Sequence, residues 1–597
     1  MMKRIVSLAL CLILCLSLVP ALADTQAQQL PVTGDMYGML DLMDPYKTTI
    51  SGLFEQPVAM DEETRLSYVY IGAENRQSEP FVMLLPDSSV TDINAWLAET
   101  GWQALADEQG LIVSIAQTKD GWTDGEVAYL EKLYTVTHAR GHYNAQKGNN
   151  YLAAYGDAAT LAQKWLMKNP QNFASAATYG PIGAIDDAYM AECAAAGSKL
   201  ANVTIGELPM PIWFFVDALD ENAEKVLAYW NKCNNVADEK YSTELATGVY
   251  MAKNDTIESL IDEQNFLAQT RYTVCENSAA PTADVTKAVW AFQSEVIRPV
   301  GFANNSLRAA RSVEEWGAVR REKVIAGVNR YWVEFVPEKL APTTEDGKVP
   351  LVVYSHGNNN TAESMLARSE FIKVANERGF IAILMTGCLY RTDRNFPNPR
   401  WNLEQDPNLF DDYAYIREAV ADTCERLPID TTRIYAMGQS YGGMATFTWM
   451  LRMNDIFAAG AATGSVGPGA GNSTSYYDQT ELNLEGNLTP VCALQGQAEG
   501  GSFENASMRE SFPYWLNRNG LGQDVDAALT GSYKSGRFNV YDFCNAQGAP
   551  LVQYISVDER IHTIVASDLF FQYDTWLSKW SRAADGALYY EGKLVEK

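Results

Sequence analysis

Short apolar segments alternate with amphipathic ones in the C-terminal half of the chain. Residues 349–354 and 380–385 are almost wholly apolar, and a third apolar run covers 433–437. Between the second and third runs, residues 411–427 carry apolar side chains at the spacing of one helical face. Buried strands that alternate with helices indicate a mostly parallel sheet covered on both sides. The pattern therefore predicts an α/β fold for this half.

The N-terminal half carries a weaker version of the same pattern. Residues 151–183 align without a gap with residues 435–467, and seven of the 33 positions are identical. The apolar run 80–86 likewise parallels 350–356. We interpret this as an internal duplication. The expected architecture is two tandem domains, each a mostly parallel sheet flanked by helices.

The first residues predict an export signal. A basic start is followed by an apolar run and by small residues before Asp24, which is typical of a secretory signal peptide cleaved after Ala23. We therefore expect a protein that is secreted, extracellular or held in the cell envelope. The predicted organisation is a signal peptide at 1–23, an exposed segment at 24–40, a first domain at 41–297, a linker at 298–325 and a second domain at 326–597.

The net charge and the cysteine content limit which partners and cofactors we expect. The net charge of −28 disfavours binding to nucleic acid or to an anionic membrane, and no segment after the signal is apolar for long enough to span a bilayer. Seven cysteines follow the signal, so at least one thiol is unpaired, and one or two disulfides are compatible with the sequence. We expect no metal and no organic cofactor; the oligomeric state is open.

The third apolar run leads directly into a motif that carries chemistry. Gly438-Gln439-Ser440-Tyr441-Gly442 lies between a predicted strand and a predicted helix. Glycines two positions before and after a serine allow a strained turn that lifts its hydroxyl above the sheet. The motif predicts Ser440 as a nucleophile.

A serine nucleophile needs a base and a group that orients the base. Of the four histidines in the chain, His562 alone follows Ser440, and it comes after the apolar segment 551–557. The chain order serine, acid, histidine then places the acid between them. Glu499, at the end of an apolar strand, is the preferred candidate; Asp558 and Glu559 are rivals that we expect to cap or solvate the histidine loop.

Backbone amides must stabilise the oxyanion that forms during acyl transfer. One is expected from Tyr441, directly after the nucleophile. The other is expected from Asn358, in the loop that follows the apolar run 349–354. His356, in the same loop, is interpreted as a structural residue that shapes the loop.

Residues 349–565 resemble the polyhydroxybutyrate depolymerase and feruloyl or acetyl xylan esterase group of α/β hydrolases. The resemblance rests on a strand ending in His-Gly, an Asp-Asp helix before Pro428, the elbow, a Gly-x-Ala-acid loop and a late His-Thr. It implies Ser440 as nucleophile, Glu499 as acid, His562 as base, and the amides of Asn358 and Tyr441 as oxyanion donors. The sequence departs from the group in having Gln495 where histidine is usual, glutamate in place of aspartate, and tyrosine in place of asparagine after the nucleophile. The elbow is also similar to those of prolyl-oligopeptidase-type peptidases.

The N-terminal copy lacks the residues for this chemistry. Gly156 aligns with Ser440 and Pro86 with His356, and no histidine occurs between 143 and 355. Asp220, which aligns with Glu499, is expected to be an ordinary loop residue. His138 and His142 have the spacing of a zinc helix but lack a following glutamate and a third ligand. We therefore predict a noncatalytic, degenerate domain that serves as a packing partner, a lid or a binding module.

The leading functional hypothesis is a secreted serine hydrolase that cleaves carboxylic esters of polyhydroxyalkanoate, feruloyl or acetyl type through an acyl-enzyme at Ser440. Its partner would be a small-molecule or polymeric ester. Two alternatives stay open at this stage: a prolyl-oligopeptidase-like serine peptidase, and a noncatalytic binding protein in which both halves are degenerate.

Overall fold

The computed structural model describes most of the 597 residues. The described residues are 27–29, 40–41, 43–48, 50–77, 79–138, 143, 145–198, 203–253, 267–299, 307–358, 360–369, 371–390, 398–403, 405–467 and 487–596. The predicted signal peptide and His142 lie outside them. In the predicted exposed segment, Gln28–Gln29 form a short strand at the edge of the first sheet.

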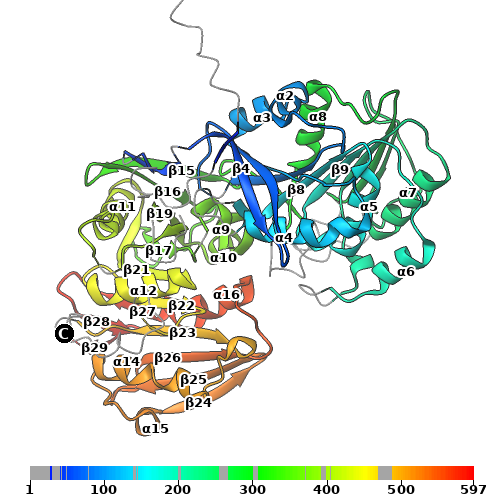
Figure 1. Ribbon diagram of the computed structural model, residues 1–597. Coiled ribbons are helices and arrows are strands. Elements are labelled where there is room, and N and C mark those ends of the chain that lie inside the picture. Colours follow the sequence, from blue (N-terminus) through cyan, green and yellow to red (C-terminus); the bar gives the residue numbers. More distant parts are fainter. Residues whose placement is uncertain are drawn as a thin grey trace, which may run out of the picture.

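The N-terminal half is built on a ten-stranded sheet (Figure 1). Its strand order is β1-β4-β5-β7-β6-β8-β9-β10-β12-β11, and the strands from β7 to β12 in this order run parallel. The strands are β1 (Gln28–Gln29), β4 (Gly52–Ala59), β5 (Thr64–Ile71), β6 (Glu79–Leu85), β7 (Ile112–Ile115), β8 (Ala145–Tyr155), β9 (Ser175–Tyr179), β10 (Ile212–Val216), β11 (Gly248–Met251) and β12 (Gln269–Val274). The helices are α2 (Ile93–Glu99), α3 (Trp102–Gln109), α4 (Val127–Thr137), α5 (Ala158–Lys168), α6 (Asp187–Ala195), α7 (Glu221–Cys233) and α8 (Ala283–Gln293).

The C-terminal half is built on a second ten-stranded sheet in the order β15-β16-β18-β17-β21-β22-β23-β26-β25-β24. The strands are β15 (Ala318–Ile325), β16 (Val328–Phe335), β17 (Val349–Ser355), β18 (Ile381–Met385), β21 (Ile429–Gln439), β22 (Ala459–Thr463), β23 (Val491–Gly496), β24 (Gly531–Ser535), β25 (Phe538–Cys544) and β26 (Pro550–Val557). The helices are α9 (Ala362–Ser369), α10 (Phe371–Arg378), α11 (Asp412–Arg426), α12 (Tyr441–Arg452), α13 (Ala506–Arg509), α14 (Phe512–Arg518), α15 (Val525–Ala528) and α16 (Ala566–Thr575).

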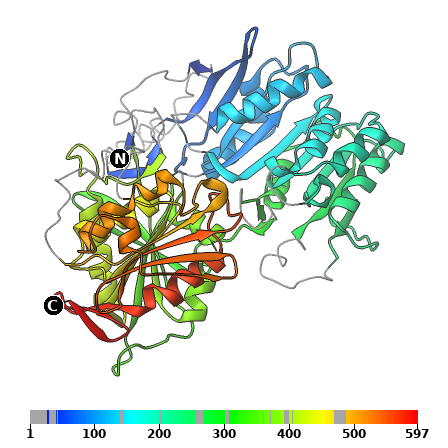
Figure 2. The same cartoon turned by 90° about the horizontal axis from the view of Figure 1, so that it is seen from below.

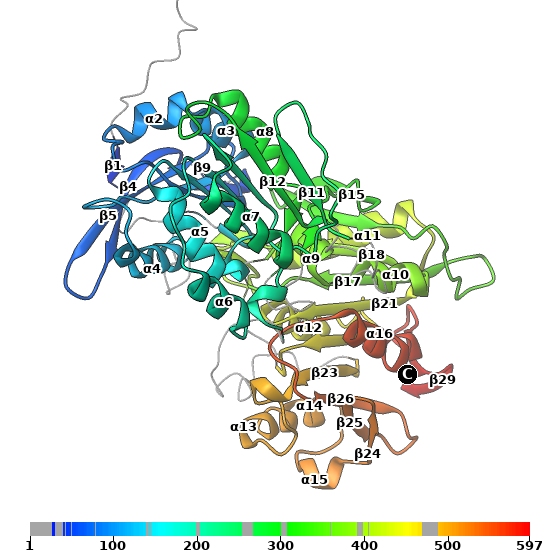
Figure 3. The same ribbon diagram turned by 90° about the vertical axis from the view of Figure 1, so that its right-hand side faces the viewer.

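The two sheets share one topology. Strands β4 to β11 of the first sheet follow the same sequence-to-space order as β15 to β25 of the second. Each has a central parallel sheet with an antiparallel pair on one side (β4–β5 or β15–β16) and an antiparallel strand on the other (β11 or β25). The first sheet is extended by β1 and the second by β24. The predicted fold of two tandem mostly parallel sheets is confirmed, while their origin by duplication stays a hypothesis. Figures 1 and 3 both show β24 at the end of the second sheet away from the first half.

Helices cover both faces of each sheet because the central strands are apolar on both sides. In the second sheet, α11, α12 and α14 bury side chains on one face, and α9, α10 and α16 on the other. Leu351 and Val353 of β17 point to the first face, and Val352 and Tyr354 to the second. Figure 2 shows the two halves from below.

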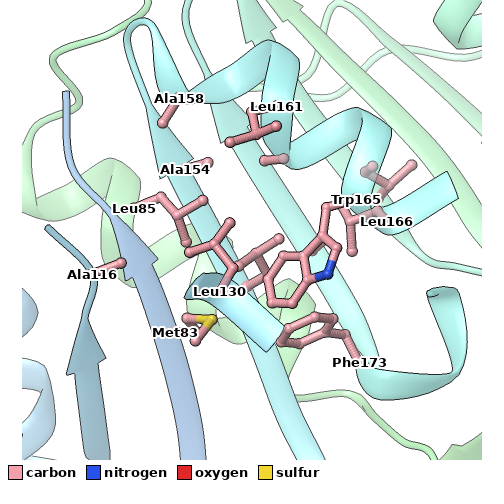
Figure 4. Packing of buried hydrophobic residues seen from close by; sticks show 14 of the residues in the cluster. Met83, Leu85, Ala116, Leu130, Ala154, Ala158, Leu161, Trp165, Leu166 and Phe173 are labelled. Atoms are coloured by element: carbon pink, nitrogen blue, oxygen red, sulfur yellow. The ribbon is translucent and has the colours of Figure 1, made fainter. Parts of the chain in front are cut away.

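The first sheet repeats this two-faced packing. Met83 and Leu85 of β6 lie in the core beneath α4 and α5, where Trp165 packs edge-on against Phe173 (Figure 4). These two aromatic residues align with Trp449 and Phe457 of the second half, which are also buried. The aligned aromatic positions are therefore core positions in both halves.

The chain between the two sheets differs from the predicted linker at both ends. Arg298 is buried in the first half, where its guanidinium donates to the carbonyl oxygens of Phe173 and Pro209. At the other end, Ala318–Ile325 form β15, the first strand of the second sheet. Ala318–Ile325 is an edge strand whose side chains are mostly exposed or half-exposed, and the Arg298 guanidinium is bonded to carbonyl groups, so polar residues here do not mark a linker. The sequence also missed β24–β25 and a small C-terminal sheet of β27 (Trp580–Arg582), β28 (Leu588–Tyr590) and β29 (Lys593–Glu596).

All seven cysteines after the predicted signal are free thiols in the structure. The disulfides left open by the sequence are therefore not formed, and most of these thiols are buried among apolar side chains. Among the described residues, no helix is both long and apolar enough to cross a bilayer.

Candidate active site

Ser440 lies at the sharp turn between β21 and α12. It has the left-handed φ of 58° with ψ of −121°, a conformation that costs a non-glycine residue energy and occurs mainly at functional turns. The Ser440 amide donates to the Thr463 carbonyl at 2.8 Å, which ties the turn to the end of β22. Gly442 permits the turn, since a Cβ there would lie 2.0 Å from the Ser355 carbonyl oxygen. The backbone at Ser440 thus has the sharp strand-to-helix turn of the predicted elbow.

The structure brings the three predicted side chains into one hydrogen-bonded relay. The Ser440 hydroxyl lies 2.8 Å from Nε2 of His562, and Nδ1 of His562 contacts Oε2 of Glu499. The tautomer that satisfies both contacts carries its proton on Nδ1 and accepts from the serine through Nε2. Glu499 also accepts from the Gly496 amide at 3.0 Å through Oε1, which fixes the carboxylate plane.

The acid and the histidine come from loops at the ends of neighbouring strands. Glu499 follows β23, and His562 follows β26, which pairs with β23 in parallel. The two loops are joined by a hydrogen bond of 3.0 Å from the Ala498 amide to the Arg560 carbonyl. The rival Asp558 is instead bonded to Lys534 at 2.6 Å and Asn539 at 2.7 Å, away from the imidazole.

The charge of Glu499 affects the base directly. Its hydrogen bond and negative charge raise the pKa of His562 above the ordinary value, against the opposing effect of partial burial. The imidazole is 47% exposed, while the Glu499 side chain is 17% exposed. An incoming molecule can therefore reach the relay at His562, while Glu499 is largely enclosed by protein.

His356 has the contacts of a structural residue. Its ring is fully buried, Nδ1 donates to the Gly357 carbonyl at 2.7 Å, and Nε2 accepts from the Gly387 amide at 2.9 Å. Burial lowers the pKa of His356 to about 4, so the ring is neutral at physiological pH.

The backbone of Gly357 lies close to Ser440, since a Cβ at Gly357 would lie 3.3 Å from Cβ of Ser440. The loop that carries Asn358 thus borders Ser440, as the predicted oxyanion role requires.

Sequence reasoning did not single out Gly464, which packs against the imidazole of His562. It has φ of +68°, and a Cβ there would lie 2.8 Å from Cε1 of His562. The sequence shows only that Gly464 aligns with Gly180, which does not reveal the nearby imidazole; both glycines have a positive φ in the structure. A side chain at 464 would push the imidazole away from Ser440.

We expect Gly464→Ala to lower kcat by roughly 10- to 100-fold, because a displacement of the base of about 1 Å costs up to that factor. The measurement is steady-state hydrolysis of p-nitrophenyl acetate. Gly520→Ala is the matched control: Gly520 has φ of +70° and open space around its Cα, so it tests the backbone strain alone. Equal activity of the two variants would show that the imidazole tolerates a methyl group at 464.

The equivalent turn of the N-terminal half is filled by a carboxylate. Gly156 follows β8 with φ of +57°, and its amide donates to Tyr179 at 2.7 Å, as Ser440 does to Thr463. Oδ2 of Asp87 accepts from the Asp157 amide at 3.1 Å, the position that corresponds to Tyr441. Asp220 caps α7 through the Ala223 amide at 2.9 Å. The turn at Gly156 therefore has the shape of an elbow but carries no nucleophile. The Asp87 carboxylate lies where an oxyanion would be bound in an active elbow.

We expect Gly156→Ser to destabilise the protein by about 1–3 kcal/mol, because a Cβ there would lie 1.7 Å from Asp87 Oδ2 and would overpack the turn. Urea unfolding followed by tryptophan fluorescence measures this. Gly536→Ser is the matched control, since Gly536 has the same φ of +57° with no atom within 4 Å. An unchanged midpoint in Gly156→Ser would mean that Asp87 moves aside freely.

Two other features lie apart from the relay. A cavity of about 620 Å³ between the halves is lined by residues that include Tyr46, Glu79, Trp290, Arg320 and Glu363, and none of the relay residues lines it. His138 packs edge-on against Phe81 and Tyr134. Within the described part of the chain, no group of three or more histidine, cysteine, aspartate or glutamate side chains could hold a metal ion.

The strand order, the elbow after β21, and the acid and histidine loops after β23 and β26 are those of an α/β-hydrolase fold. Residues 399–490 match the model of the prolyl oligopeptidase family. The chain is 30% identical over 193 residues to feruloyl esterase B of Neurospora crassa, covering 31% of this chain and 58% of the esterase. The match thus spans less than two thirds of that relative.

Solved structures of low sequence identity overlap the chain in part. An acetyl xylan esterase from Aspergillus awamori is 13% identical, with a TM-score of 0.32, over 44% of this chain and 99% of the esterase. A feruloyl esterase module from Clostridium thermocellum in complex with sinapinate is 11% identical, with a TM-score of 0.30, over 44% of this chain and 86% of the module.

Proposed function

We propose that the protein is a serine hydrolase that cleaves carboxylic esters through an acyl-enzyme at Ser440. The observation that carries the proposal is the relay itself: a strained elbow serine 2.8 Å from an imidazole whose other nitrogen contacts a carboxylate. The sequence match to feruloyl esterase B adds support for esters over other acyl compounds.

In the proposed mechanism, His562 accepts the Ser440 proton as the hydroxyl oxygen attacks the ester carbonyl carbon. Glu499 keeps the imidazole in the required tautomer and stabilises the imidazolium. The amides of Asn358 and Tyr441 donate to the oxyanion. The imidazolium then protonates the leaving alcohol, and water activated by the same base hydrolyses the acyl-serine, which restores the free hydroxyl.

The proposed substrates are esters of feruloyl, acetyl or hydroxyalkanoate type. Export to the outside of the cell, which the first 23 residues predict, fits polymeric substrates that do not enter cells. The His562 side chain is 47% exposed, which fits access by a bulky ester. Neither a metal nor an organic cofactor is needed for this chemistry.

The test is turnover of p-nitrophenyl acetate, p-nitrophenyl butyrate and methyl ferulate by the purified protein, with labelling by a fluorophosphonate probe. We expect turnover and a single labelled serine, identified by peptide mass spectrometry as Ser440. A folded protein with neither turnover nor labelling would overturn the proposal and favour a binding protein.

A serine peptidase is the second candidate, because residues 399–490 match the prolyl oligopeptidase family. Both reactions use the same relay, so only the substrate distinguishes them. Succinyl-Ala-Pro-p-nitroanilide beside p-nitrophenyl acetate separates the two: we expect the ester to be cleaved with the higher kcat/KM by far. A larger kcat/KM for the anilide would favour the peptidase.

A further inference from the structure

One side chain of the N-terminal half is inserted into the C-terminal half. Tyr46 lies on β3 (Asp44–Thr48), which is tied to the first half by an ion pair of 2.8 Å between Asp44 and Arg76 and by a hydrogen bond from the Gln77 amide to the Tyr46 carbonyl. The Tyr46 side chain is 2% exposed and packs edge-on against Tyr331 of β16. The segment 43–48 therefore bridges the two halves: it is bonded to Arg76 and Gln77 of the first half, the Asn329 amide of the second half donates to the Met43 carbonyl at 3.1 Å, and the Tyr46 side chain is buried in the second half.

The Tyr46 hydroxyl bonds a buried charge of the second half. Arg330 donates from Nε to this hydroxyl at 2.9 Å and from Nη2 to Asp412 at 2.7 Å, and both members of the ion pair are 1% exposed. The guanidinium also lies over the ring of Tyr415. A buried ion pair holds its geometry only when its remaining N–H groups are bonded. Tyr46 supplies one of these bonds from outside the second half.

A first path leads from the ion pair to the loop beside the nucleophile. The second oxygen of Asp412 accepts from the Asn402 amide at 2.6 Å. The adjacent Trp401 donates from its indole to the His356 carbonyl at 2.9 Å, and its own carbonyl accepts from the Tyr441 hydroxyl at 3.2 Å. The ion pair thus fixes a segment that contacts Tyr441, whose amide is one expected oxyanion donor, and His356, two positions before the other expected donor.

A second path reaches the same histidine from its other side. The Thr386 carbonyl accepts from Arg330 Nη2 at 3.4 Å and from the Tyr46 hydroxyl at 3.5 Å. The next amide, that of Gly387, donates to Nε2 of His356 at 2.9 Å. His356 is therefore held at its carbonyl and at its ring by two segments that both depend on Arg330.

We infer that Tyr46 is a positioning residue through which the N-terminal half holds the His356–Asn358 loop in place for oxyanion stabilisation. This gives the degenerate half a role in catalysis without any chemistry of its own. The inference rests on the proposed hydrolase function. It predicts that loss of the Tyr46 hydroxyl weakens stabilisation of the oxyanion while leaving the relay of Ser440, His562 and Glu499 intact.

The experiment compares Tyr46→Phe with Tyr70→Phe. Tyr70 is the matched control, because its hydroxyl is bonded at 3.0 Å to Asp107 within the first half. We expect Tyr46→Phe to lower kcat for p-nitrophenyl acetate by about tenfold, part of the 10²–10³ that loss of a whole oxyanion donor costs. KM and the pH at which kcat/KM is half-maximal should stay those of the wild type, and Tyr70→Phe should keep the wild-type kcat.

Hydrogen exchange separates this inference from the proposed function, because it needs no turnover. Faster exchange of the Gly387 amide and of peptides containing 356–358 is expected in Tyr46→Phe and not in Tyr70→Phe. Wild-type kcat together with wild-type exchange in Tyr46→Phe would overturn the inference while the hydrolase stands. A loss of kcat accompanied by a shifted pH profile would also overturn it, since the effect would then lie in the base.

Discussion

Ser440→Ala is expected to lower kcat for p-nitrophenyl acetate by about 10⁵-fold or more, since removal of the nucleophile leaves only the oxyanion donors and binding to accelerate the reaction. The fold should survive, because alanine removes a single oxygen at a half-exposed position. The variant should also lose all fluorophosphonate labelling. The measurement is kcat by stopped assay at high enzyme concentration, with far-ultraviolet circular dichroism to confirm folding.

The control for this substitution is Ser578→Ala. Ser578 is half-buried and donates to the Asp574 carbonyl at 3.3 Å, remote from the relay. It should retain the wild-type kcat and label normally. Turnover by Ser440→Ala within tenfold of the wild type would show that another group attacks the ester.

Glu499→Gln is expected to lower kcat by about 10⁴-fold, because a neutral amide neither stabilises the imidazolium nor selects the Nδ1-protonated tautomer. Asp558→Asn is the control, since Asp558 was the rival acid and is bonded to Lys534 and Asn539. Asp558→Asn should stay close to the wild-type kcat. The opposite ranking of the two variants would transfer the acid role to Asp558.

The pH dependence gives a second readout of the same residue. Glu499 raises the pKa of His562, and the base works only when neutral, so activity falls as pH drops through this raised pKa. The acid limb of kcat/KM should therefore lie above the ordinary histidine value of about 6.5. Glu499→Gln should move the limb to lower pH. A limb at the same pH in both proteins would contradict coupling between Glu499 and the base.

Local patterns were enough to predict the central sheet and the members of the relay. The motif around Ser440 lies between an apolar run and a helix, and chain order left His562 as the one histidine after it. Glu499 was chosen because it follows a strand, and the structure places it against the imidazole. These choices needed only the order of elements along the chain. In a parallel sheet, the loops that follow successive strands lie next to one another at one edge. Their catalytic roles remain to be tested by the variants above.

Features that depend on contacts between distant segments could not be predicted. The contact between Tyr46 and Arg330 joins residues 284 positions apart, and nothing in either neighbourhood indicates the other. Gly464 has no motif of its own, and its importance comes from the imidazole that packs against it. Arg298 likewise lies inside the first half and not in a linker, because its guanidinium is bonded to the carbonyl of Phe173, 125 positions away in the sequence.

The insertion of Tyr46 also bears on how the chain folds during synthesis. Tyr46 leaves the ribosome 284 residues before Arg330, which at typical rates of 5–20 residues per second is roughly 14–57 s. The last strand of the first half ends at Ile297, so the whole first half has been synthesised only shortly before Arg330. Because domains generally fold in the order of synthesis, we expect the second half to form in the presence of the first. A chain that begins after residue 317 would lack the Tyr46 ring that packs against Tyr331 and the hydroxyl that bonds Arg330, and would have to fill that space with its own side chains.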